Sequence, residues 1–154
     1  MEIRAARGLA GLFLATACSS GTVTTATSPT TQTFSRDVDA TPAMVVTSTV
    51  KVFGDHHIPI AVADQPSGTV RSAPVNLREV LIGPPDERVT CTGAAAADTV
   101  GAVMVVLEVK AKGSGNESVV DLNAQRDNQT RACVVHSSVA AALLDEIVAG
   151  AEGS

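Results

Sequence analysis

The feature that most constrains the fold is a series of short Val-rich segments separated by clusters of turn-forming residues. After Thr41-Pro42, apolar and polar residues alternate with a period of two, which is typical of a strand with one solvent-facing side. The apolar side has Val46, Val50 and Val52, and the polar side has Thr47, Thr49 and Lys51. Further strands are predicted at 58–63, 72–82, 88–92, 100–111, 118–124 and 131–136. About seven short strands with Gly, Pro, Asn and Asp between them predict an antiparallel sandwich.

The C-terminal segment has a different pattern. Val139, Leu143 and Ile147 recur at helical spacing, after the possible N-caps Ser137 and Ser138 and before Gly150. Alanine has the highest helix propensity, so the run 140–142 also favours a helix over a strand. We therefore expect an all-β fold with a short C-terminal helix that begins at about residue 137 and packs on the sheet.

The core must be built without large aromatic side chains. The chain has no Trp and no Tyr, and its aromatic residues are Phe13, Phe34 and Phe53. Stacking platforms for nucleotides, sugars or single strands normally need aromatic faces, so such ligands are disfavoured. The formal net charge of −5 also argues against a nucleic-acid partner.

Residues 1–17 have the layout of a secretory signal peptide. Arg4 and Arg7 come first, an apolar run follows at 8–15, and the small residues Thr16 and Ala17 end the segment. The run is far shorter than the roughly 20 apolar residues of a membrane-spanning helix, so a membrane attachment would have to be covalent. An N-terminal helix that stays on the protein is the alternative.

The segment Leu14-Ala15-Thr16-Ala17-Cys18 resembles the lipobox of bacterial lipoproteins. Thr16, Ala17 and Cys18 match the family pattern, whereas Ala15 stands where the family has Leu or Val. The resemblance implies transfer of a diacylglyceryl group to the Cys18 sulfur and cleavage before Cys18. The same bond also fits ordinary signal peptidase, because Ala15-Thr16-Ala17 is an A-x-A site, so plain secretion stays open.

A polar segment follows the cysteine. Ser and Thr dominate residues 19–35, and such a composition cannot bury enough apolar surface to offset the entropy of ordering. We expect residues 18–41 to be a disordered tether that begins at the lipidated Cys18, and residues 42–150 to be the folded domain. Ser/Thr-rich segments with Pro also resemble O-glycosylated stalks, and a bare linker is the alternative.

The three cysteines fit an exported protein if they have different roles. With lipid on Cys18, Cys91 and Cys133 remain as one pair in an oxidising compartment. A bridge would close a loop of about 43 residues and contribute roughly 4 kcal/mol in the chain-entropy model. Two free buried thiols are the alternative.

The segment Val103–Lys110, its Gly-rich turn and Val119–Leu122 predict a central hairpin. This stretch resembles a strand-turn-strand piece of small immunoglobulin-like domains in actinobacterial lipoproteins, including the telokin-like group. The resemblance implies an immunoglobulin-like sandwich and no active site. The sequons at Asn116 and Asn128 are interpreted as turn residues, since the leader implies a bacterial source.

No motif indicates catalysis or a cofactor. His56 and His57 follow Asp55, but neighbouring residues on a strand point to opposite faces, so we expect an exposed polar turn and no metal site. We expect a noncatalytic envelope lipoprotein on the extracytoplasmic face of the cell membrane. Its sandwich would bind an envelope protein or another ligand. The alternatives are a carrier of an apolar molecule between the sheets, and an enzyme using Asp55, His56, His57 and His136.

Overall fold

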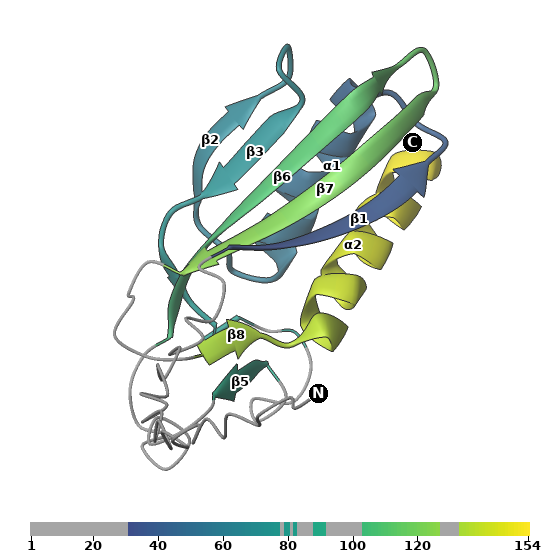
Figure 1. The fold of residues 1–154 in the computed structure, drawn as a ribbon. Coiled ribbons are helices and arrows are strands. Elements are labelled where there is room, and N and C mark those ends of the chain that lie inside the picture. The colour runs from purple at the N-terminus through teal and green to yellow at the C-terminus, as the bar shows by residue number, and fades with distance from the viewer. Residues whose placement is uncertain (1–30, 78, 81, 83–87, 92–102, 127–132) are drawn as a thin grey trace, which may run out of the picture.

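The computed structural model describes residues 31–77, 79–80, 82, 88–91, 103–126 and 133–154. Within this part, one antiparallel sheet packs its apolar face against two helices, and a small two-stranded sheet lies beyond one end of it (Figure 1). The expected antiparallel sheet and C-terminal helix are confirmed. The predicted leader 1–17, Cys18 and the tether up to residue 30 lie outside the described residues.

The large sheet has the strand order β1-β7-β6-β3-β2, with β4 also paired to β6. Its centre is the hairpin of β6 (Met104–Ser114) and β7 (Glu117–Arg126), which confirms the predicted hairpin. Gly115 and Asn116 form the turn, and Gly115 has a φ of 68°, a conformation that glycine adopts readily. The strands β2 (Ile60–Asp64), β3 (Thr69–Ser72) and β4 (Val75–Asn76) complete one side of the sheet. The prediction of one strand over 72–82 is therefore wrong beyond residue 76, because the described residues after it are turns and bends.

The segment after Thr41 is a helix, α1 (Pro42–Asp55), so the strand predicted there is wrong. Thr41 is its N-cap, and the Thr41 side chain accepts a hydrogen bond from the backbone N–H of Met44 at 3.3 Å. Pro42 occupies the first turn, where its missing N–H costs nothing. The side chains buried by α1 recur at helical spacing: Val45, Val46, Ser48, Thr49, Val52 and Phe53. Burial of this face outweighs the weak helix propensity of β-branched residues.

Residues 31–38 form the edge strand β1 (Thr31–Val38), which corrects the predicted disordered tether to residue 41. The strand pairs with β7 along its whole length, from Thr31 opposite Gln125 to Val38 opposite Ser118. Phe34 packs against the core and Val38 is buried in it, while Thr31, Thr33 and Ser35 face solvent. The folded domain therefore begins about ten residues earlier than the composition suggests.

The C-terminal helix α2 (Ser137–Glu152) crosses the same face of the sheet beside α1 (Figure 1). Its N-cap is His136, whose Nδ1 accepts from the backbone N–H of Ser138 at 3.3 Å, rather than Ser137 or Ser138. It also continues past Gly150. A Cβ atom at Gly150 would overlap the Ser48 hydroxyl of α1, and that hydroxyl donates to the Ile147 carbonyl at 2.7 Å. The two helices thus meet at a glycine that permits close approach.

The small sheet pairs β5 (Val89–Cys91) with β8 (Cys133–Val135), and these strands lie within the predicted strands 88–92 and 131–136. Gln32 of β1 connects this sheet to the large one. Its side-chain amide donates to the Val135 carbonyl at 3.2 Å and accepts from the Val135 N–H at 2.8 Å. The Gln32 amide therefore replaces a peptide group at the point where β1 and β8 meet.

The immunoglobulin-like sandwich and the all-β class are wrong for the described residues. A sandwich buries one sheet against another, whereas here α1 and α2 cover the apolar face of the large sheet. The buried hydrophobic side chains of the described residues are aliphatic apart from Phe53. The domain is an α+β fold of two layers, with the second face of the sheet open to solvent.

We expect Gly150→Ala to destabilise the fold by about 1–3 kcal/mol, because its new methyl group overpacks the contact with Ser48. Gly54→Ala in α1 is the matched control: its Cβ meets no atom within 4 Å, so the replacement should be neutral or stabilise by up to about 1 kcal/mol. Urea unfolding of both variants measures the difference. Equal stability of the two would contradict the close helix contact.

Candidate functional site

The open face of the large sheet is built from outward-facing residues on five strands. Strand register aligns them in two complete rows, each in the order β1, β7, β6, β3, β2. One row is Thr33, Asn123, Glu108, Arg71 and Val62, and the next is Ser35, Asp121, Lys110, Thr69 and Asp64. We call the surface formed by these ten residues the polar face.

Hydrogen bonds and ion pairs order the side chains of the polar face. The Thr33 hydroxyl donates to Asn123 Oδ1 and the Ser35 hydroxyl donates to Asp121 Oδ1, each at 2.7 Å. Lys110 Nζ lies 2.7 Å from Glu108 Oε1, and Lys112 Nζ lies 3.2 Å from Asp121 Oδ2. The hydrogen bond from Ser35, aided by the Lys112 charge, lowers the pKa of the Asp121 carboxyl below its usual value. Lys110 and Glu108 both lie on β6, whereas the other three pairs cross between neighbouring strands and help to align them.

A hollow of about 280 Å³ lies on this surface at the end where β1 begins. We call it the face hollow. Its lining residues are Thr31, Arg71, Val106, Glu108, Lys110, Asn123 and Gln125. Arg71 and Gln125 are exposed, Glu108, Lys110 and Asn123 are half-buried, and Val106 is buried. The hollow therefore presents polar groups from four strands around one apolar side chain.

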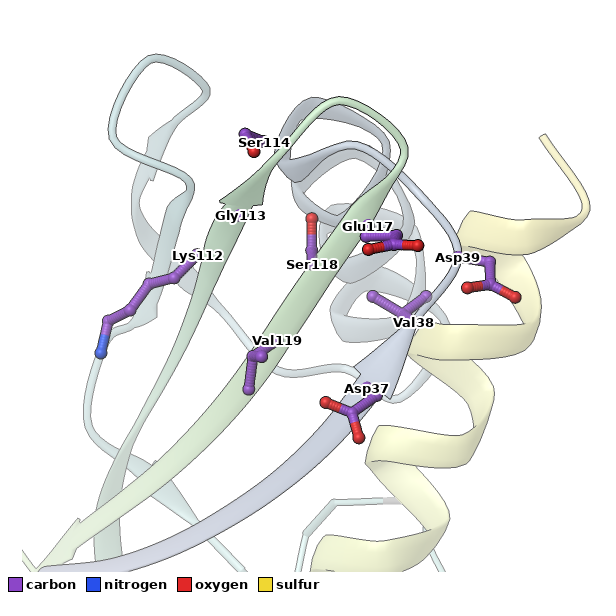
Figure 2. Close-up of a pocket in the computed structure, with 9 residues that line it drawn as sticks. All are labelled: Asp37, Val38, Asp39, Lys112, Gly113, Ser114, Glu117, Ser118 and Val119. Atoms are coloured by element: carbon purple, nitrogen blue, oxygen red, sulfur yellow. The ribbon is translucent and has the colours of Figure 1, made fainter.

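A second hollow, of about 390 Å³, lies at the tip of the β6–β7 hairpin (Figure 2). Figure 2 shows the carboxylates of Asp37, Asp39 and Glu117 on the β1 side of the hairpin, with the Lys112 side chain directed away from them. At its base the buried Ser118 hydroxyl donates to the Ala40 carbonyl at 2.7 Å. In the described residues no three His, Cys, Asp or Glu side chains are placed to hold a metal ion. The tip is an acidic, solvated surface.

A third hollow, of about 650 Å³, lies at the C-terminal end of α1. Ile58, Pro59, Pro74, Val75 and Met104 supply most of its apolar lining, and His57 and Glu79 are among its polar residues. His57 is exposed and has a φ of 58°, so it fits the expected polar turn.

His56 differs from the prediction of an exposed turn. Its side chain is 15% exposed, and its Nε2 lies 2.6 Å from Glu146 Oε2 of α2. His56 therefore joins the two helices. His136 caps the N-terminus of α2, about ten residues or 15 Å along the helix from Glu146. Asp55 is paired with Lys51 on the surface of α1. The four residues of the enzyme hypothesis thus do not converge in one pocket.

The two remaining predicted site residues, Cys91 and Cys133, lie directly opposite each other in the register of β5 and β8. Their side chains lie outside the described part of the structure. The polar face cannot be predicted from the composition of the chain, because it depends on β1, whose Ser/Thr-rich sequence predicts a tether. The alternation of Thr31, Thr33 and Ser35 with Gln32 and Phe34 was the signal that could have found it.

Comparisons with known proteins leave the family open. No protein-family model matches the chain, and no curated protein matches it. One solved structure that the chain resembles is the major latex-like protein 151 of Panax ginseng, at 10% identity and a TM-score of 0.40. The match covers 81% of this chain and 97% of that one. Similarity at this level supports no functional conclusion. In the described residues no helix has the length and hydropathy needed to cross a membrane.

We expect Asp121→Asn to lower the stability of the fold at pH 7 and to lower it less at pH 2. The pKa of Asp121 is lowered in the folded state, so its contribution is present above the unfolded pKa of about 3.9 and is lost as the pH falls through the folded value. Asp64→Asn on the same face is the control for charge removal. Thermal unfolding at both pH values provides the measurement, and an equal loss at pH 2 would contradict the assignment.

Proposed function

We propose that this protein is an exported bacterial lipoprotein whose noncatalytic domain binds a ligand or an envelope protein through the polar face. The signal-peptide layout of residues 1–17 and the lipobox-like segment at Cys18 support export and anchoring. The observation that carries the binding surface is the one-sided cover of the sheet: α1 and α2 bury one face, and the other face has ordered polar side chains around a hollow.

Because the fold begins at Thr31, the linker from Cys18 is short, and its length limits how far the domain can lie from the membrane. Residues 19–30 are the 12 residues between Cys18 and β1. Fully extended, they span at most about 40 Å, and as a flexible coil about 20 Å on average. The domain would therefore stay within about its own diameter of the lipid surface, on the extracytoplasmic side.

The observed packing favours binding at the surface over the carrier alternative. A carrier needs a large cavity lined by Val and Leu between its layers. In the part of the chain that the structure describes, large side chains fill the space between the sheet and the helices, including Phe53, Leu107, Leu122, Leu143 and Ile147, each at most 1% exposed. The geometry gives the enzyme alternative no support, because His56 pairs with Glu146 in the middle of α2 and His136 caps the N-terminus of that helix.

The proposal includes a disulfide bond between Cys91 and Cys133. Directly opposed residues of antiparallel strands have Cα atoms about 4.5–5.5 Å apart, which falls within the range that a disulfide spans. The pairing of Cys91 with Cys133 supports a bridge across β5 and β8. It would stabilise a sheet of only two short strands, which is otherwise marginal.

We expect Cys18→Ala to release the protein from the membrane fraction, because its sulfur is the proposed site of acylation. Ser19→Ala, one residue further, should stay in the membrane and serves as the matched control. Intact mass of the N-terminal peptide measures the acyl group, and fractionation measures location. Unmodified Cys18 in the culture medium would refute the anchor.

Replacing both Cys91 and Cys133 by Ser should lower the free energy of unfolding by roughly 2–5 kcal/mol, the usual cost of losing a native bridge. Reduction of the unmodified protein should lower its stability to the same level and leave the double variant unchanged. Peptide mapping without reductant detects the bridge directly. Two free, alkylatable thiols in protein freshly isolated from the envelope would show that the bridge is absent.

A further inference from the structure

We infer that the face hollow binds a small organic carboxylate. This inference rests on the proposal that the polar face is the binding surface, and it names the class of ligand. The hollow is close to the lower size limit of small-molecule pockets, about 300 Å³, and four strands hold its lining in place.

The charges of the hollow favour an anion. Arg71 and Lys110 contribute two positive charges and Glu108 one negative charge. Strand register places Arg71 opposite Glu108, whose carboxylate is already paired with Lys110 at 2.7 Å. In the described part of the chain, no hydrogen bond or ion pair occupies the Arg71 guanidinium. Arg71 is therefore available to a ligand, and the lining has an excess of one positive charge.

The neutral groups of the hollow supply hydrogen-bond donors. Thr33 donates to Asn123 Oδ1, and this bond leaves the two N–H groups of Asn123 Nδ2 for a partner. The Gln125 amide and the Thr31 hydroxyl, opposite each other on β7 and β1, add further donors. A guanidinium pairs with a planar carboxylate through two parallel hydrogen bonds, and amide N–H groups extend that recognition. Val106 provides an apolar surface for the carbon atoms of the ligand.

The test is a titration in which succinate is added, at constant ionic strength, to the isotopically labelled chain in the form that the host exports. We expect saturable shifts of the side-chain amide signals of Asn123 and Gln125, since both line the hollow. Arg71→Gln should weaken binding at least tenfold, and Glu108→Gln should strengthen it, because the replacement removes the negative charge beside the anion. Arg36→Gln is the matched control, since Arg36 faces α2 and pairs with Asp145.

Three outcomes would overturn the inference. They are no shift with succinate, an equal loss of affinity with Arg36→Gln, and binding of putrescine or of inorganic phosphate in place of succinate. Failure here is distinct from failure of the anchor, because the anchor depends on Cys18 and the inference depends on the residues that line the hollow. Cys18→Ala should therefore bind succinate as the unmodified chain does.

Discussion

The close contact of α1 and α2 joins the two helices into the layer that covers one face of the sheet. Val, Leu and Ala side chains make thin layers, so the helices must approach each other and the sheet closely to exclude water. Gly150 permits this approach, and the Ser48 hydroxyl uses it to donate to the Ile147 carbonyl. The His56–Glu146 pair joins the same helices at the C-terminal end of α1. Covering one face of the sheet in this way leaves the other face open to solvent.

The correct predictions were those in which the hydrophobic period and the local propensity or turn residues indicate the same element. The β6–β7 hairpin combined strong alternation with a Gly-Asn turn, and α2 combined helical spacing with a run of alanines. The strand prediction after Thr41-Pro42 was wrong because the β-branched residues there fit both a strand period of two and a helical period of 3.6 over a short window. Thr41 followed by Pro42 was the decisive local signal, since an N-cap followed by Pro at the first helical position marks a helix start.

The site was harder to predict than the fold because it depends on register. Arg71, Glu108 and Asn123 are far apart in the sequence, and only the pairing of β3, β6 and β7 aligns them. Thr33 completes their row from a segment whose Ser/Thr composition also suits a disordered linker. A hydroxyl-rich strand is stable here because β7 provides a paired edge and Phe34 and Val38 pack inward. Composition alone contains none of that information.

The position of the face hollow has a consequence for an anchored protein. Thr31 both lines the hollow and begins the fold, so a tether from Cys18 would reach the domain at that end. The acidic tip, with Asp37, Asp39 and Glu117, lies at the opposite end of β1 and β7. Anionic lipid headgroups would repel this tip within a Debye length of the surface, about 8 Å at physiological ionic strength. The same repulsion would favour the orientation in which the tip points away from the membrane and the carboxylate site lies toward it.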